Sequence, residues 1–466
     1  MMAVQEKQDL YFERFAALAE AREAREPAWL RDIRRAAMDR FGELGFPTTK
    51  NEEWRFTNVA PIARTAFVPA KVPSGYPKVG KSSDGSPWIT DCRTLAFING
   101  RFDSKLSEIG GLPQGLKVGN LGDTLRDGKS PTGSALEAHL TRYADYRDHA
   151  FVALNTALFE DGALIEVAPD TAVKQPIVLW FFNLPGDEPA MTHPRNLVLV
   201  GAGAQASFIE MHVCYHKATG PYFTNAVTEI IAGENAVVDY TRVQREADHG
   251  YHVGILQVEQ GRSSSVTTHT ISLGGRLDRE EARAVLNGEG AEALLHGLYV
   301  IGGHQHVDNH TLIDHAKPHC ASREVYKGVL DGHAAGVFNG KIAVRKDAQK
   351  TDSKQSNKNL LLSEDATINT KPQLEIFADD VKCTHGATIG QIDPEAVFYL
   401  RSRGIGLEDA RNLLIQAFAN DVLDRIKFEP LRFSLRETLA ARLGQVGSAS
   451  VANDGNGRQS SLEEIA

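Results

Sequence analysis

The stretch GRSSSVTTHTISLGGRLDREEARAVLNGEGAEALLHGLYVI, residues 261–301, alternates glycine-led turns with short runs that have the two-residue period of a β-strand. The glycines that open these and the preceding turns are Gly201, Gly233, Gly261, Gly274 and Gly288. Their separations are 32, 28, 13 and 14 residues, so the last two are near half of the first two. This spacing is typical of a stacked solenoid with coils of roughly 28 residues. A β-sandwich would give a similar alternation, so both folds stay open at this point.

Working outward, the strand pattern covers residues 150–392, and helical patterns lie on both sides of it. Residues 1–149 are expected to form an N-terminal helical region with a Pro/Gly/Ser-rich linker over residues 72–87. Asp393 and Pro394 predict a helix start and open a C-terminal helical domain, residues 393–443. The Gly/Ser/Asn-rich tail, residues 444–466, is expected to be disordered. Flanking helices suit a solenoid, because its end strands have unpaired edges that must be covered.

Composition restricts the function classes. The 466 residues carry a net charge of −9 without a strong basic run, which argues against nucleic acid as the main partner. The N-terminus is charged from its start and the apolar runs are short, so neither a signal peptide nor a membrane span is expected. Four cysteines form no CxxC pair, which favours a cytoplasmic protein with reduced thiols.

Two glycine motifs resemble nucleotide sites. Residues 75–82, GYPKVGKS, match the phosphate-loop pattern, and Lys81 would be its lysine. That chemistry needs a strand before the loop and a helix after it, and the flanking Pro/Ser/Gly residues supply neither. GAGAQA, residues 201–206, matches the dinucleotide fingerprint but leads into a strand. We therefore expect no nucleotide site in this chain.

The motif KCTHGATIG, residues 382–390, holds the strongest candidate for metal binding. Cys383 and His385 are two residues apart, so on a strand their side chains share one face. A thiolate and an imidazole are suitable ligands for iron or zinc. Two ligands do not complete a metal site, so a second chain would have to supply the others. Taken alone, either residue also fits a structural role. The other cysteines, Cys92, Cys214 and Cys320, are expected to be structural.

A histidine-rich segment, HQHVDNHTLIDHAKPHC, residues 304–320, offers an alternative. His304, His306 and His310 would make a cupin-like, metal-dependent enzyme. A cupin site also needs a glutamate a few residues on, where Asn309 and His310 stand. The other interpretation is that these histidines line turns or the wet face of a strand.

Four stretches of the sequence carry a family resemblance: HVDNHTLIDHAKPHCASREVYKGVLDG (306–332), FNGKIAVRKDAQKTDSKQSNKNLLLSEDATINTKPQLEIFADDVKCTHGATIGQ (338–391), FYLRSRGI (398–405) and NEEWRFTNV (51–59). They resemble the SufB/SufD proteins of iron–sulfur cluster assembly, and the SufD branch in particular. The resemblance implies a mainly β protein, a right-handed parallel β-helix flanked by N-terminal and C-terminal helical domains.

The resemblance also implies a role and partners. The chain would be a non-catalytic scaffold in a complex with SufB and two copies of the ATPase SufC. In isolation, a homodimer of this chain is also an expectation. SufB would pair along the β-helix, and SufC would dock on the C-terminal helical domain, where Tyr399, Arg401 and Arg403 are the expected contacts. Cys383 and His385 would be transient ligands of iron or of an iron–sulfur cluster shared with SufB. A reduced flavin is implied for the complex, and no residue here is assigned to it.

Overall fold

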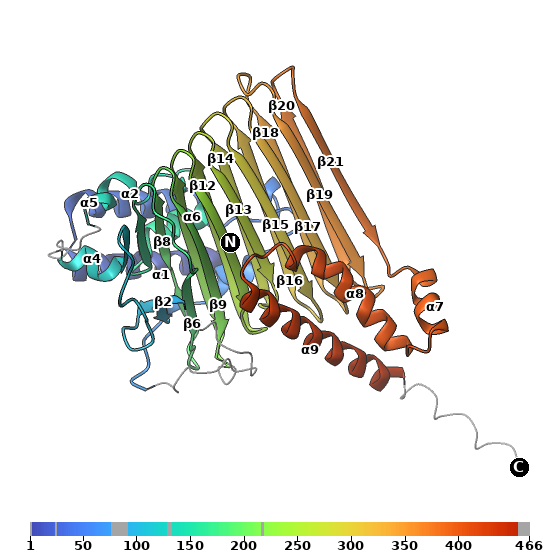
Figure 1. Cartoon of the computed structure of the whole chain (residues 1–466). Coiled ribbons are helices and arrows are strands. Elements are labelled where there is room, and N and C mark those ends of the chain that lie inside the picture. Colours follow the sequence, from blue (N-terminus) through green and yellow to red (C-terminus); the bar gives the residue numbers. More distant parts are fainter. Residues whose placement is uncertain (1, 24–25, 76–91, 128–132, 216–218, 455–466) are drawn as a thin grey trace, which may run out of the picture.

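Between residues 205 and 390 the chain forms strands of about ten residues, and successive side chains of a strand point to opposite faces of its sheet. Each sheet therefore has an inward and an outward face to bury. The computed structural model describes residues 2–23, 26–75, 92–127, 133–215 and 219–454. Within them the strands coil into a parallel β-solenoid made of two facing sheets (Figure 1). The predicted solenoid is confirmed. The sandwich alternative is wrong, because each long strand pairs in parallel with the strand one coil away.

Successive long strands alternate between the two sheets. The 11-stranded first sheet comprises, from its C-terminal edge, β20 (Thr367–Ile376), β18 (Ala335–Val344), β16 (His306–His315), β14 (Leu277–Leu286), β12 (Gly250–Gln260), β10 (Tyr222–Ala232), β8 (Arg195–Val200), β5 (Ala163–Val167) and β4 (Leu116–Asn120), with β7 (Ala190–Thr192) beside β10 and β1 (Val68–Pro69) beside β7. The 10-stranded second sheet comprises β21 (Lys382–Gly390), β19 (Asp352–Leu361), β17 (Ala321–Leu330), β15 (Glu292–Ile301), β13 (Ser265–Ser272), β11 (Val237–Arg245), β9 (Gln205–Cys214), β6 (Ile177–Asn183), β2 (Arg93–Ile98) and β3 (Arg101–Phe102).

The glycines that marked the repeat stack at the corners of the coils. The Gly233 N–H donates to the Val200 carbonyl one coil away, and a Cβ on Gly233 would lie 2.8 Å from the Ala202 nitrogen. Only glycine fits such a close approach of two backbones. Gly274 lies at the opposite corner, between β13 and β14, which explains why the separations of 13 and 14 residues are half a coil. The Gly201 motif is a turn between β8 and β9, as predicted.

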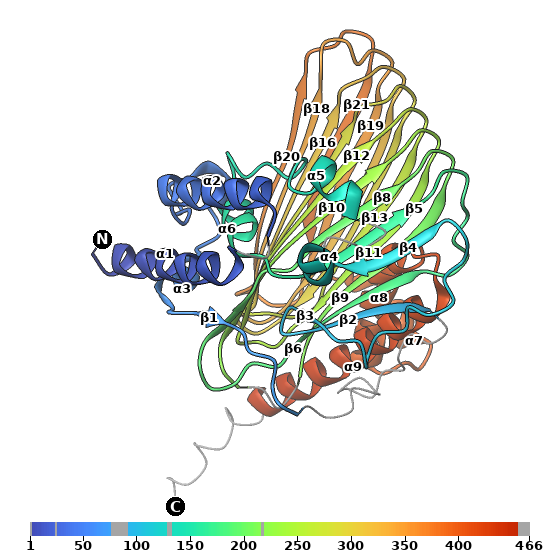
Figure 2. The same cartoon turned by 90° about the vertical axis from the view of Figure 1, so that its left-hand side faces the viewer.

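Helices cover the outer faces of both sheets (Figure 2). The first sheet is packed against the N-terminal elements, which are α1 (Met2–Arg22), α2 (Ala28–Leu44), η1 (Glu52–Trp54), α3 (Ala60–Arg64), α4 (Leu121–Asp127), α5 (Gly133–His139) and α6 (Ala150–Leu158). The second sheet is packed against α8 (Leu407–Leu423) and α9 (Glu429–Asp454). The remaining helix, α7 (Pro394–Ser402), has no buried residue. No helix in the described ranges is both long enough and apolar enough to cross a membrane.

Several predicted boundaries differ from the structure. α6 is a helix inside the region 150–392 that was read as strands, because it is buried all round and has no amphipathic period. β2 and β4 of region 1–149 belong to the solenoid sheets. Within region 1–149, α5 ends at His139, because the chain turns there and presents the N–H groups of Tyr143 and Ala144 to the buried Glu229 carboxylate.

The C-terminal region also differs in detail. The buried face of α8 is centred on Ile415 and Ala419, whereas Leu414 is half-buried and Ala417 is exposed. α9 continues to Asp454, past the point where the tail was expected to begin, since each residue added to an existing helix gains a hydrogen bond. Residues 455–466 and most of the phosphate-loop motif, including Lys81, lie outside the described residues.

Candidate functional site

Cys383 and His385 lie on β21, the last strand of the second sheet, and both face the interior of the solenoid. Cys383 is in register with Ser353 and His385 with Gln355, and both partners are buried between the sheets. Because β21 ends the stack, Cys383 is half-buried and His385 is exposed. The prediction that the two share one strand face is therefore confirmed, and their common face opens at the end of the solenoid.

The residues beneath Cys383 form a column that becomes polar toward this end. In register from the first coils it runs through Ala206, Val238, Val266, Ala293, Ser322, Ser353 and Cys383. The Ser322 and Ser353 hydroxyls are 2.7 Å apart, and the His315 Nε2 is 2.9 Å from the Ser322 hydroxyl. Burial raises the pKa of the Cys383 thiol. The thiol therefore stays protonated at neutral pH until a metal or another cation approaches it.

A second polar column lies beneath His385. The Gln355 amide donates to the Glu324 carboxylate over 2.7 Å, and Glu324 is buried. Burial raises the pKa of Glu324 to about 7. These polar residues were missed in the sequence. The signal was present in three aligned strands, in which Ser322 and Glu324, Ser353 and Gln355, and Cys383 and His385 occupy the same two positions.

The two donors do not form a complete metal site within the described part of the chain. The groups of three convergent potential ligands found there contain neither Cys383 nor His385. A bound iron or cluster needs about four ligands. The chain therefore offers two potential ligands on the accessible end strand β21, and any further ligands would come from outside the described chain.

The backbone of β21 offers an open edge beside these donors. The Lys382 N–H donates to the Thr351 carbonyl, and N–H groups along a parallel strand point alternately to its two sides. The N–H groups of Cys383, His385, Ala387 and Ile389 therefore face away from β19. On the other terminal strand, β20, the Thr367 N–H donates to the Ala334 carbonyl on the β18 side. By the same alternation, Pro372 stands at a position that faces away from β18. Proline lacks a donor, so β21 is the more complete edge.

The predicted partner contacts Tyr399, Arg401 and Arg403 lie on or directly after α7, beyond the end of β21 (Figure 1). Tyr399 is 57% exposed, and the Arg403 guanidinium lies 5.1 Å from the centre of its ring. The neighbouring Phe398 is 74% exposed. A short helix that buries none of its residues and exposes two aromatic rings is a candidate for docking.

The histidines of the cupin alternative do not converge. His304 is in the turn before β16 and stacks on His333, with ring centres 4.9 Å apart. His306 and His310 are on the outer face of β16, where His306 Nε2 contacts the Thr57 hydroxyl at 2.9 Å. No ligand group in the described residues includes any of the three. The cupin alternative is wrong, because a parallel solenoid places these side chains on a helix-covered face and in a turn.

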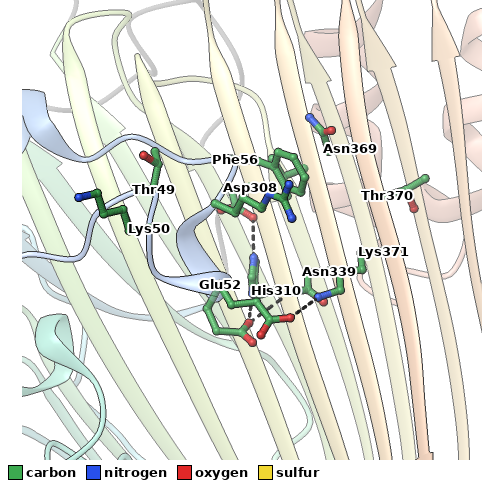
Figure 3. Close-up of a pocket in the computed structure, with 13 residues that line it drawn as sticks. Thr49, Lys50, Glu52, Phe56, Asp308, His310, Asn339, Asn369, Thr370 and Lys371 are labelled. Atoms are coloured by element: carbon green, nitrogen blue, oxygen red, sulfur yellow. Dashed lines mark hydrogen bonds and ion pairs between the residues drawn. The ribbon is translucent and has the colours of Figure 1, made fainter.

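His310 instead lines a pocket of about 580 Å³ between residues 49–56 and β16, β18 and β20 (Figure 3). Its Nε2 is 3.0 Å from Asp308 and its Nδ1 is 3.3 Å from Glu53, which also accepts from Asn339. Asp308 in turn pairs with Arg279, which lies over the Trp54 ring. This charged network fastens the NEEWRF segment onto the solenoid.

The other cysteines have structural surroundings. Cys92 and Cys320 are buried. Cys214 is half-buried, and burial raises the pKa of its thiol to about 12. None of these three belongs to a group of convergent ligands in the described ranges.

Comparison with known proteins covers nearly the whole chain. Residues 5–179 match the SufBD protein N-terminal region, and residues 182–418 match the SufBD core domain of SUF system FeS cluster assembly. An iron–sulfur cluster assembly SufBD family protein of Synechocystis is 35% identical over 420 residues, which cover 88% of this chain and 90% of that protein. The iron–sulfur cluster assembly protein SufD of Escherichia coli is 30% identical over 407 residues, covering 86% and 89%. The chloroplastic protein ABCI7 of Arabidopsis thaliana is 29% identical over 422 residues, covering 87% and 85%.

Proposed function

Because the chain belongs to the SufBD family of iron–sulfur cluster assembly proteins, we propose that it is the SufD-like scaffold subunit of a SufBCD complex. The observation that carries this proposal is the pair Cys383 and His385 on the last, accessible rung of the solenoid, with no third ligand beside them in the described chain. In this proposal the subunit supplies two ligands and a rigid scaffold, and it catalyses no step itself.

SufB is the proposed partner at the open end. The outward N–H groups of β21 offer hydrogen bonds to a strand of SufB, and such pairing brings the partner's side chains next to Cys383 and His385. The nascent cluster, or iron on its way to it, is then held by ligands from both subunits. A site divided between two chains releases its cargo when they separate, whereas a closed four-ligand site in one chain retains it.

SufC is the proposed partner of the C-terminal helices. Phe398, Tyr399, Arg401 and Arg403 form the proposed contact surface. α7 follows β21 after three residues, so a displacement of α7 on ATP binding would act directly on the strand that carries the ligands. ATP hydrolysis by SufC would in this way drive the opening of the shared site.

The test is co-expression of the chain with SufB and SufC and measurement of iron and sulfide in the purified complex. Cys383→Ala and His385→Ala should each lower the cluster content several-fold while the complex still assembles. Thr384→Ala is the matched control, because Thr384 is on the same strand but faces the opposite side. Unchanged cluster content in both ligand variants would refute the site assignment.

A second measurement tests the role of SufC. Cys383 should be alkylated at different rates in the assembled complex with and without ATP, in a Cys214→Ser background that removes the other partly accessible thiol. Equal rates would contradict coupling between nucleotide turnover and the open end. Replacing Phe398 and Tyr399 by alanine should abolish that difference along with SufC binding.

A further inference from the structure

A second group of potential ligands lies inside the solenoid, away from the terminal rung. His252 of β12 and Asp278 and Glu280 of β14 each offer one ligand atom, and these atoms lie within 4.8 Å of one another. His252 and Asp278 are fully buried and Glu280 is 4% exposed. The strand β14 is separated from the terminal β20 by β16 and β18, so this group is distinct from the site of Cys383 and His385.

Neighbouring residues hold two of these side chains by the atom that faces away from the group. The His252 Nδ1 is 2.9 Å from the Glu246 carboxylate, and the Glu280 Oε2 accepts from Arg242 over 2.8 Å. The other atoms, His252 Nε2 and Glu280 Oε1, lie 3.4 Å apart. A carboxylate on the far nitrogen of a histidine is the usual support of a metal ligand, because it fixes the ring and its tautomer.

Gly254, two residues after His252, makes room for this support. A Cβ at this position would lie 2.5 Å from Glu280 Oε2 and 2.6 Å from Arg242 Nη1. The Arg242–Glu280 pair therefore occupies space that any larger residue would fill. Glycine at position 254 therefore leaves the space in which Arg242 orients the Glu280 carboxylate.

The atoms that face one another make no hydrogen bond within the described chain, and His252 Nε2 and Glu280 Oε1 share only the ion contact of 3.4 Å. His252 Nε2, Glu280 Oε1 and both carboxylate oxygens of Asp278 have no hydrogen-bond partner there, and the nearby Ser272 hydroxyl does not reach hydrogen-bonding geometry. Buried polar atoms without partners are rare and costly. The group thus has three convergent ligand atoms without hydrogen bonds, and neighbouring residues orient two of the three side chains, as a cation site requires.

We propose that His252, Asp278 and Glu280 bind a divalent first-row transition metal ion inside the solenoid. One imidazole nitrogen and carboxylate oxygens suit Mn²⁺, Fe²⁺ or Zn²⁺, and the buried position excludes the water shell that Mg²⁺ retains. The site does not depend on the proposed function at the open end.

The experiment loads the cation during expression, because a fully buried site exchanges slowly. The full chain is expressed in the double background Cys383→Ala, His385→Ala, in media supplemented with Mn²⁺, Fe²⁺ or Zn²⁺, and its metal content is measured after treatment with chelator. About one ion per chain is expected with at least one of the three. Absence of bound metal in all three media would overturn the proposal.

Variants separate the site from nonspecific binding. Asp278→Asn should lower the metal content at least tenfold and keep the fold, since asparagine resembles the protonated acid. Asp239→Asn, at a buried carboxyl on the outer face of β11, is the matched control and should retain the metal. Circular dichroism checks folding, and His252→Gln repeats the test should Asp278→Asn fail to fold. Metal retained by the folded site variant would refute the assignment.

Discussion

The two ends of the solenoid are built differently. At the N-terminal end the last strands turn back antiparallel, β3 on β2 and β4 on β5, and the intervening loop packs Ile109 and Leu112 against the interior. At the C-terminal end β20 and β21 are the terminal strands of their sheets within the described residues, and Phe377 and Ile389 are 67% and 51% exposed. Short, reversed strands blunt an edge, whereas a long straight strand invites pairing. The chain thus blunts the strand edges at one end and leaves long straight edges at the other.

The largest difference between the ends should come from proline in a strand. Leu179→Pro, in the middle of β6 at the closed end, removes a hydrogen bond between two neighbouring strands and should cost about 3 kcal/mol or more. Ala387→Pro removes only an outward N–H of β21, so the melting temperature should change by no more than a few degrees. Thermal unfolding by circular dichroism measures both.

The same Ala387→Pro variant should lose binding to SufB, because it interrupts the row of edge donors. Co-purification from cells that express both chains measures this loss, with Thr384→Ala as the control. Equal destabilisation by the two prolines, or intact SufB binding by Ala387→Pro, would remove the distinction between a closed and an open end.

Side-chain truncation should give the next largest contrast. Phe97 is fully buried and stacks on Phe181 with ring centres 4.8 Å apart, so Phe97→Ala should cost about 3–5 kcal/mol. Phe377→Ala at the open end should cost less than about 0.5 kcal/mol, since surface truncations are usually that small. Urea unfolding of the isolated chain compares them. A large cost at Phe377 would mean that the open end is covered in the free protein.

A smaller, pH-dependent effect is expected where residues 49–56 brace the first sheet near its open end. Burial and Arg279 oppose the charged form of His310, but Asp308 and Glu53 outweigh them and raise its pKa. The hydrogen bond with His310 is the main cause that lowers the pKa of Glu53. The contribution of Glu53 is lost as pH falls below its ordinary value of 4.5, and that of His310 is lost as pH rises above 6.5 and through the raised pKa.

The difference in melting temperature between wild type and His310→Gln should therefore be greatest between about pH 4.5 and 6.5 and should shrink toward pH 9. His333→Gln is the control, because His333 is exposed and pairs with the exposed Asp365. A difference that stays constant with pH would show that His310 contributes by packing alone.

The smallest effect should come from the surface ion pair between Lys371 of β20 and Glu52, which are 2.8 Å apart and 41% and 75% exposed. Lys371→Ala should change the free energy of unfolding by less than about 1 kcal/mol, and the change should vanish in high salt. Urea unfolding at two salt concentrations measures it. A larger, salt-independent loss would indicate that β20 depends on this contact for its place in the sheet.

The sequence by itself determined the alternation of strands and turns and the placement of Cys383 and His385 on one strand face. Its spacing favoured the solenoid, and the family resemblance implied that fold. Glycines at the coil spacing and a two-residue alternation are local signals, because each reports a backbone or side-chain constraint within a few residues. The all-round apolar helix α6 was missed for the same reason, since a fully buried helix has no local period to read.

Only the tertiary structure decided which face of β21 is accessible and that Pro372 lies on the outer edge of β20. It also showed that His310 belongs to the charged network that holds residues 49–56 on the first sheet. It alone brought His252 to Asp278 and Glu280, because the register between β12 and β14 pairs residues 26 positions apart in neighbouring coils. Such contacts depend on how the strands stack, and no short window of sequence contains them.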